Sequence, residues 1–120
     1  MARILLVDDD WTNLETLSKA CQFLGHQATV CDTGKQVTGM ALAGCPDLII
    51  LDVHLQDLDG INVLEALRQE PGTSRIPVVF TSAGSPEEDQ EVIQASGVTD
   101  YLSKPVSLAA LQAVIQRYSV

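Results

Sequence analysis

The chain has 120 residues, a hydrophobic fraction of 46% and a formal net charge of −9 at pH 7. A chain of this length is expected to form one domain (residues 1–120) and to bury about two thirds of its unfolded surface. The negative charge argues against nucleic acid and anionic membranes as partners, and favours basic protein surfaces and metal cations.

The cysteines and the apolar runs indicate the compartment. The number of cysteines is odd, and no CxxC pair occurs among Cys21, Cys31 and Cys45. This pattern predicts reduced thiols rather than disulfides or a zinc site. No apolar run approaches the ~20 residues that span a bilayer, and the four apolar residues after Arg3 are too few for a signal peptide. We therefore expect a cytoplasmic chain that does not contact a membrane.

Strands and helices are predicted to alternate five times, with short connections. The predicted strands are residues 3–7, 27–31, 48–52, 76–80 and 100–103. Apolar residues at helical spacing mark three of the helices. These faces are Leu14, Leu17, Cys21 and Leu24, then Ile61, Leu64 and Leu67, and finally Leu108, Leu111, Val114 and Ile115. This alternation predicts an α/β fold in which helices cover both faces of a parallel sheet.

The ends of several helices carry recognisable signals. Gly25 is expected to close the first helix, and Thr33 to cap a weak second helix that runs to about residue 43. Ser107 is expected to cap the last helix. Ser85 starts a capping box before a helix over residues 86–96. The faint apolar face of that helix has two explanations, poor packing alone or an element that moves when the protein changes state.

Polar side chains follow the buried strands. Asp8 and Asp9 follow the first strand, Asp52 ends the third, Thr81 follows the fourth and Lys104 the fifth. Because the carboxyl ends of parallel strands share one edge of the sheet, we expect these groups to converge. Crowded carboxylates repel one another and need a cation, and oxygen ligands with room for water suit Mg²⁺.

This arrangement predicts phosphoryl chemistry. Asp52 is a candidate nucleophile that forms an aspartyl phosphate, while Mg²⁺ and Lys104 neutralise the phosphoryl oxygens and Thr81 donates a hydrogen bond to one of them. No side chain is placed as a general base, so hydrolysis of the acyl phosphate should be slow. We therefore expect a switch rather than a turnover enzyme.

At these residues the chain resembles the receiver domain of two-component response regulators, including the single-domain chemotaxis type. The matching motifs are Val7–Asp9, Pro46–Asp52, Asp59–Gly60, Pro77–Thr81 and Lys104–Pro105. The likeness extends over essentially all 120 residues. It implies a flavodoxin-like (βα)5 fold, doubly wound around a five-stranded parallel sheet in the order 2-1-3-4-5.

The resemblance also implies the roles of the site residues. Asp52 would accept a phosphoryl group from the phosphohistidine of a kinase or of a phosphotransfer protein. Asp9, Asp52 and the main-chain carbonyl of His54 would bind Mg²⁺, with Mn²⁺ as an alternative, and Asp8 would bind it through water. The change would pass to an unnamed downstream protein, and the monomer would pair, if at all, on phosphorylation.

Further residues are assigned by the same resemblance. Tyr101 would be the switch aromatic that rotates inward when Thr81 engages the phosphoryl group, and the Lys104–Pro105 peptide bond would be cis. His54 and Ala83 would tune the lifetime of the phosphoryl group. For His54, two roles stay open, shielding of the acyl phosphate or orientation of water, beside the simpler interpretation of an exposed loop residue. Tyr101 could likewise be a half-buried strand residue that does not rotate.

Two residues depart from the family pattern. Gln56 stands where proline is usual, which predicts a less rigid loop after Asp52. Ser82 stands where alanine is usual, and adds a hydroxyl near the site.

Three other functions fit the sequence less well. An enzyme of the haloacid-dehalogenase type needs a second aspartate two residues after the nucleophile, where this chain has His54. A flavin- or nucleotide-binding module is disfavoured by the acidic loop after the first strand, which would repel phosphate. A docking domain that works without phosphorylation would have no need of the whole set of polar residues.

Overall fold

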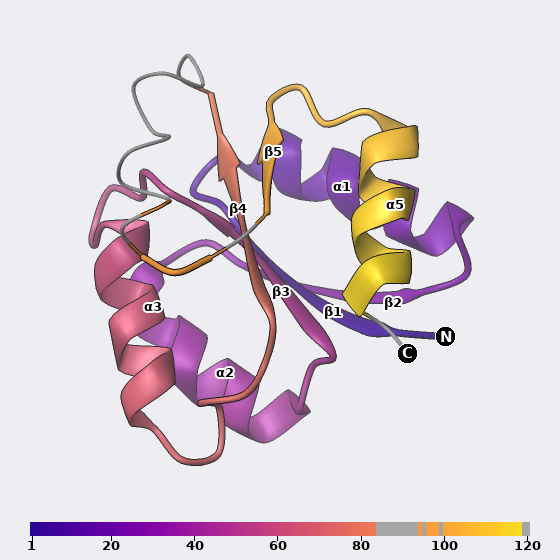
Figure 1. The fold of residues 1–120 in the computed structure, drawn as a ribbon. Coiled ribbons are helices and arrows are strands. Elements are labelled where there is room, and N and C mark those ends of the chain that lie inside the picture. Colours follow the sequence, from indigo (N-terminus) through magenta and orange to yellow (C-terminus); the bar gives the residue numbers. More distant parts are fainter. Residues whose placement is uncertain (84–93, 95, 99, 119–120) are drawn as a thin grey trace.

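A parallel sheet forms the centre of the molecule. The computed structural model describes residues 1–83, 94, 96–98 and 100–118. Within these residues the five strands have the order β2-β1-β3-β4-β5, which confirms the predicted flavodoxin-like topology (Figure 1). The strands are β1 (Arg3–Val7), β2 (Gln27–Cys31), β3 (Leu48–Asp52), β4 (Val78–Ser82) and β5 (Tyr101–Ser103).

The described helices lie between these strands in the sequence, except for the last one, which follows β5. They are α1 (Trp11–Phe23), a 3₁₀ turn η1 (Gly34–Gln36) that continues into α2 (Val37–Gly44), α3 (Gly60–Gln69) and α5 (Leu108–Tyr118). Most of the helix expected over residues 86–96, with its capping box at Ser85, lies outside the described residues. None of the helices in the described part combines the length and the apolar character that crossing a membrane requires.

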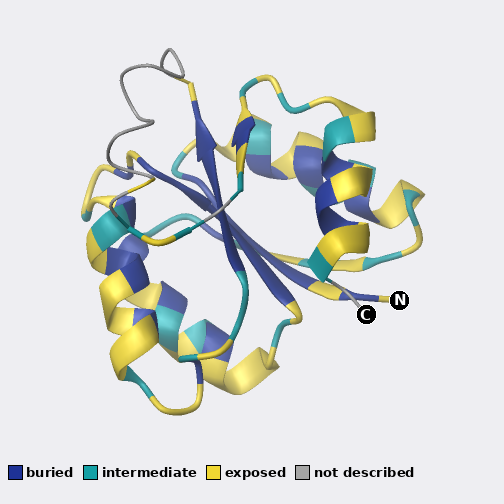
Figure 2. Cartoon of the chain, in the orientation of Figure 1, coloured by how far each residue is buried: buried dark blue, intermediate teal, exposed yellow. Residues whose placement is uncertain are grey.

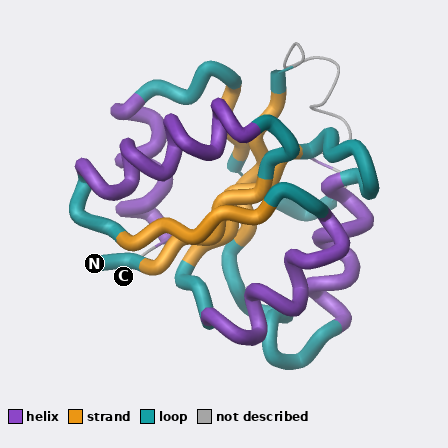
Figure 3. The backbone as a smooth tube through the Cα atoms, turned by 180° about the vertical axis from the view of Figure 1, so that it is seen from behind, coloured by secondary structure: helices purple, strands orange, loops and turns teal. Residues whose placement is uncertain are grey.

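Alternate residues of each strand serve two separate cores, because successive side chains point to opposite faces of the sheet. Leu5 and Val7 of β1 pack in the core beneath α2 and α3. Ile4 and Leu6 pack in the other core, beneath α1 and α5. The three central strands β1, β3 and β4 are accordingly buried along almost their whole length, whereas most residues of the edge strands β2 and β5 are exposed or half-buried (Figure 2). The sheet lies between two helical layers (Figure 3). Close packing of the central strands therefore defines where the residues at their ends lie.

Several of the predicted helix ends are confirmed. Gly25 has a φ of +88° after α1, in the left-handed region that favours glycine. The Ser107 hydroxyl accepts a hydrogen bond from the Ala110 N–H at 3.1 Å, as a cap of α5 should. The Lys104–Pro105 peptide bond is cis.

The strand predicted at residues 76–80 is shifted by two residues, to Val78–Ser82. The polar groups of Ile76 are used elsewhere, because its N–H donates to the Thr73 carbonyl and its own carbonyl accepts from Arg68. At the other end, the Lys104 N–H donates to the Ser82 carbonyl, which extends the strand.

Two predictions about the helices are wrong. Leu108 was expected on the inner face of α5, but it is 44% exposed, because it begins the helix at the rim of the core. Thr33 was expected to cap the second helix through its side chain. It holds the N-cap position of η1, yet its hydroxyl makes no capping hydrogen bond.

Candidate functional site

The strand register brings the predicted site residues together. Val7 of β1 pairs with Leu51 of β3, so the next residues, Asp8 and Asp52, lie side by side where the two strands end. On the other side of β3, Asp52 pairs with Thr81 of β4. Residues far apart in the sequence thus converge at the carboxyl edge of the sheet, as the sequence predicts.

Lys104 joins the two buried carboxylates. Asp8 is 1% exposed and Asp52 is 4% exposed. The Lys104 Nζ atom lies 2.8 Å from Asp8 Oδ2 and 2.9 Å from Asp52 Oδ2. Because burial strengthens electrostatic interactions, this shared ammonium group stabilises both carboxylates far more than a surface ion pair would.

The pKa values of Asp52 and Lys104 are both raised, although burial and ion pairing oppose each other in each residue. Burial raises the pKa of Asp52, although hydrogen bonds from the His54 N–H and from Lys104 oppose the shift. Burial alone would lower the pKa of Lys104, but its bonds to Asp8 and Asp52 outweigh this effect and raise it. Lys104 therefore stays charged, while the charged form of Asp52 carries a free-energy cost of burial.

A third carboxylate completes a cluster that can hold a metal ion. Asp8, Asp9 and Asp52 each offer an oxygen, and these oxygens lie within 4.8 Å of one another. Two oxygens bound to one Mg²⁺ at about 2.1 Å lie at most about 4.2 Å apart, so small side-chain movements suffice. Asp8 Oδ2 is buried and accepts no well-formed hydrogen bond from the described residues, its contact there being the Lys104 ion pair. The all-oxygen cluster fits a hard divalent cation such as Mg²⁺.

Gly60 closes the loop that follows Asp52. Its N–H donates to the Val53 carbonyl at 2.7 Å. A Cβ atom at this position would lie 2.7 Å from the Asp52 carbonyl oxygen, closer than Cβ atoms approach in proteins, and 3.0 Å from Phe80 Cε1, which is a tight contact. Glycine at the start of α3 thus lets the chain return against the strand end that carries Asp52.

Comparison with known families gives a match along nearly the whole chain. A model of the response regulator receiver domain matches residues 4–116. The chain belongs to the receiver domain family. Receiver domains of this kind serve in response regulators and in histidine kinases, so the cluster described above lies in a signalling protein of the two-component type.

Relatives place this receiver domain in chains of different length. It is 32% identical to the protein PilH of Pseudomonas aeruginosa over 115 residues, 96% of this chain and 95% of PilH. It is 30% identical over 115 residues to the histidine-protein kinase BarA of Escherichia coli K12, 96% of this chain but 12% of BarA. The chain thus spans nearly all of one relative and a small part of the other.

A solved structure gives the same picture in three dimensions. The receiver domain of the sensor histidine kinase PA1611 of Pseudomonas aeruginosa PAO1 is 31% identical, with a TM-score of 0.89, over 98% of this chain and 96% of that one. That crystal structure has a magnesium ion coordinated in its active-site cleft.

The residues assigned to switching occupy two environments in this receiver domain. Thr81 is buried, at 1% exposure, beside Asp52. Tyr101 lies on β5 and is 39% exposed, so its ring is partly in solvent. The Thr81 hydroxyl is thus buried, whereas the Tyr101 ring is half-exposed. The inward rotation of Tyr101 stays a prediction. Ser82 is buried next to Thr81, while Ala83 is exposed.

His54 follows the strand end in an exposed position. Its main-chain N–H donates to Asp52 Oδ1 at 3.0 Å. This bond fixes the Asp52 carboxylate from the side opposite to Lys104, which contacts the other carboxylate oxygen. The metal-binding role of the His54 carbonyl and the effect of its side chain on phosphoryl lifetime stay predictions.

Two contacts of this loop carry no signal in the sequence. The Gln56 main-chain N–H donates to Asp9 Oδ2 at 3.1 Å. The Asp57 carboxylate accepts hydrogen bonds from the Gly34 N–H at 2.8 Å and the Lys35 N–H at 3.1 Å. A main-chain donor carries no sequence signal, and Asp57 bonds to a segment more than 20 residues away, so only a folded structure brings these groups together.

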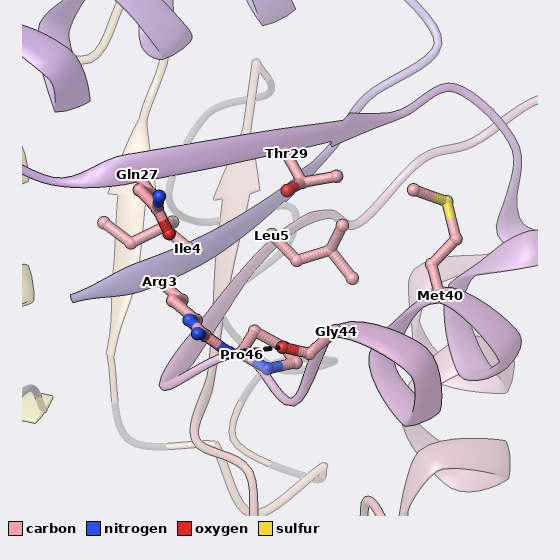
Figure 4. Close-up of a pocket in the computed structure, with 8 residues that line it drawn as sticks. All are labelled: Arg3, Ile4, Leu5, Gln27, Thr29, Met40, Gly44 and Pro46. Atoms are coloured by element: carbon pink, nitrogen blue, oxygen red, sulfur yellow. Dashed lines mark hydrogen bonds between the residues drawn. The ribbon is translucent and has the colours of Figure 1, made fainter.

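A hollow of about 210 Å³ lies at the opposite edge of the sheet (Figure 4). Arg3, Gln27, Met40 and Pro46 are among the residues that line it, and Arg3 is the charged one. Its lining contains no carboxylate, so this hollow offers none of the phosphoryl or metal chemistry found at the carboxyl edge.

Proposed function

We propose that this chain is a phosphoacceptor switch in a two-component pathway, with Asp52 as the acceptor. The observation that carries the proposal is the contact of Lys104 with both buried carboxylates, next to a third carboxylate in metal-binding range. An ordinary structural ion pair would not need two buried carboxylates on one ammonium group and a third carboxylate beside them. The excess of negative charge is suited to a site that takes up a cation and a phosphoryl group.

Asp52 acts as the nucleophile. One of its carboxylate oxygens forms a bond to the phosphorus atom of a phosphohistidine, and the bond from phosphorus to the imidazole nitrogen breaks. The electron pair of that bond stays on the nitrogen, and because the other ring nitrogen of the phosphohistidine carries a proton, the histidine leaves as neutral imidazole. The product is an acyl phosphate on Asp52.

The neighbouring groups orient and neutralise the reacting atoms. The His54 N–H and Lys104 hold one carboxylate oxygen each, so the carboxylate is fixed before the donor arrives. Lys104 is also placed to pair with a phosphoryl oxygen, and the Thr81 hydroxyl to donate to another. Asp9 and Asp52, the His54 carbonyl and, through water, Asp8 would hold a Mg²⁺ ion, which would supply further positive charge for the phosphoryl oxygens.

Phosphorylation is relayed to a partner through Thr81 and Tyr101. Movement of Thr81 toward the phosphoryl group would free space for the half-exposed Tyr101 ring to turn inward. The protein exists in two conformations, and the phosphoryl group shifts the population toward one of them. Dephosphorylation is slow, with His54 and Ala83 setting its rate, so the chain is not a turnover enzyme.

The partners follow from this role. A histidine kinase or a histidine phosphotransfer protein supplies the phosphoryl group, and a downstream protein binds the changed surface. The chain acts as a single domain and as a monomer, with pairing reserved for the phosphorylated form. A cytoplasmic location is in keeping with the free thiols of Cys21, Cys31 and Cys45.

The test uses a small donor in place of the kinase. The protein is incubated with phosphoramidate, which contains the relevant nitrogen–phosphorus bond, and MgCl₂, and its intact mass is measured. We expect the addition of one phosphoryl group, which disappears in Asp52→Asn and when EDTA replaces Mg²⁺. Asp47→Asn, at the opposite edge of the sheet, should be labelled like the wild type. Equal labelling of Asp52→Asn would contradict the proposal.

A further inference from the structure

The loop between β3 and α3 touches two of the three metal-site carboxylates through its main chain. The His54 N–H bonds to Asp52 Oδ1 at 3.0 Å, and the Gln56 N–H bonds to Asp9 Oδ2 at 3.1 Å. Between them, the Leu55 side chain is buried at 7% exposure and anchors the loop in the core. The position of residue 56 therefore decides whether Asp9 receives this hydrogen bond.

The next residue fixes the loop from its other side. Both oxygens of the Asp57 carboxylate are used, since Oδ1 accepts the Gly34 N–H and Oδ2 accepts the Lys35 N–H. These N–H groups begin η1, where a cap is needed. The residue at the N-cap position, Thr33, makes no capping bond, and its buried hydroxyl has no hydrogen-bond partner among the described residues. The Asp57 carboxylate, from another loop, thus provides the capping hydrogen-bond acceptors that the Thr33 side chain does not provide.

The packing at Gly34 leaves little freedom in this connection. A Cβ atom at Gly34 would lie 3.0 Å from Leu58 Cβ and 3.0 Å from Val63 Cγ2. The start of η1 is therefore in close contact with the loop and with α3. Because the main chain is so near, the short Asp57 side chain can reach two adjacent N–H groups at once.

We propose that Asp57 is a positioning residue for the metal site. By holding residue 57 against the start of η1, it keeps the adjacent Gln56 N–H on Asp9 Oδ2 and so orients Asp9 toward the cation. The bond uses one of the four acceptor sites of the Asp9 carboxylate and leaves the others for Mg²⁺. Hydrogen bonds to metal ligands orient them in this way, and their loss typically weakens metal binding about 10- to 100-fold. The inference rests on the proposed function, since it assigns a role within the same site.

Two simpler explanations compete with positioning. The Asp57 charge could attract Mg²⁺ directly from a distance, or Asp57 could stabilise the fold without affecting the site. Long-range attraction is screened at about 1 M salt, where the Debye length is about 3 Å. A purely structural role would lower the melting temperature and leave both the metal affinity and the Gln56 amide unchanged.

The experiment compares Asp57→Ala and Asp57→Asn with Asp47→Ala. Asp47 is a matched control, because its carboxylate also accepts a main-chain N–H, that of Arg3 at 2.8 Å, but at the opposite edge of the sheet. The dissociation constant for MgCl₂ is measured by calorimetry at low salt and at about 1 M KCl. Hydrogen exchange of the Gln56 amide is followed by NMR without metal.

We expect Asp57→Ala to raise the dissociation constant for Mg²⁺ about tenfold at both salt concentrations and to speed exchange of the Gln56 amide. Asp57→Asn keeps one oxygen acceptor and should lie between this variant and the wild type. Asp47→Ala should change neither quantity by more than about twofold, as expected for a distant site.

Unchanged exchange of the Gln56 amide, or equal affinities in Asp57→Ala and Asp47→Ala, would overturn the positioning role alone. An effect on affinity that vanishes at high salt would also overturn it, in favour of direct attraction. If the wild type itself binds no Mg²⁺, the metal site of the proposed function fails, and the positioning role fails with it.

Discussion

The two edges of the sheet use aspartate in opposite ways. At the amino edge, Asp47 is exposed and forms a closed exchange with Arg3, in which each main-chain N–H finds an oxygen of the other residue at 2.8 Å. At the carboxyl edge, Asp8 and Asp52 are buried and share one ammonium group with each other. The first edge satisfies its carboxylate and stabilises the fold. The second keeps negative charge in excess, which lowers stability but allows a cation and a phosphoryl group to bind.

Removal of the Lys104 ammonium group, which Asp8 and Asp52 share, should have the largest effect on the difference in stability between the two edges. Lys104→Met leaves two buried carboxylates without their ammonium partner, so we expect a loss of about 3 kcal/mol in the free energy of unfolding in EDTA. Arg3→Met at the amino edge should cost less than about 0.5 kcal/mol, because the Arg3 guanidinium is exposed. Urea unfolding of both variants measures the difference. Equal losses would show that the two edges do not differ in this respect.

Added Mg²⁺ should stabilise the carboxyl edge selectively. At a free concentration of about 100 times its dissociation constant, Mg²⁺ should raise the free energy of unfolding by about 2.7 kcal/mol. Asp9→Asn removes a charged ligand and should lose most of this gain, whereas Asp47→Asn should retain it. Thermal melting with and without MgCl₂ is the measurement. Retention of the full gain in Asp9→Asn would remove Asp9 from the metal site.

Neutralising one aspartate at each edge should change stability in opposite directions. Burial raises the pKa of Asp52, so its charged form is disfavoured in the folded state. Asp52→Asn should therefore raise the free energy of unfolding in EDTA by about 1 kcal/mol. Asp47→Ala removes the acceptor of the Arg3 N–H and should lower it by about 1 kcal/mol. The same sign for both variants in urea unfolding would contradict the comparison.

The smallest expected effect concerns acid pH and Asp57. Hydrogen bonds from the Gly34 and Lys35 main chain hold the pKa of Asp57 below its ordinary value of 3.8. A lowered pKa in the folded state gives stability that is present above the ordinary value and is lost as the pH falls below it. The stability difference between the wild type and Asp57→Asn should thus be larger at about pH 6 than at about pH 3. A difference that grows on acidification would reverse the assigned sign.

The fold could be predicted because local and global signals agree. Unbroken apolar runs such as Leu48–Leu51 are typical of strands buried on both faces, and their alternation with helices predicts parallel order. The register then places Asp8, Asp52 and Thr81 together without further information. The position of Lys104 can be predicted by the same argument, since its strand ends at the same edge of the sheet.

The misplaced details depend on contacts across the chain. Threonine is a residue type that often caps helices, but the side chain that accepts hydrogen bonds from the start of η1 is that of Asp57, in another loop. Leu108 fits the helical spacing, yet it lies outside the core, at the exposed start of α5. Gln56 was expected to loosen its loop because it replaces a usual proline. It also gives the loop an N–H that proline lacks, and this N–H is bonded to Asp9.

Gly60 has a practical consequence for anyone who diversifies this protein in a library. Any larger residue there would press on the Asp52 carbonyl and on the ring of Phe80, which directly precedes Thr81. A single methyl group would thus disturb two neighbouring strands in one step. Position 60 should tolerate almost no replacement in a deep mutational scan, even though it carries no reactive atom.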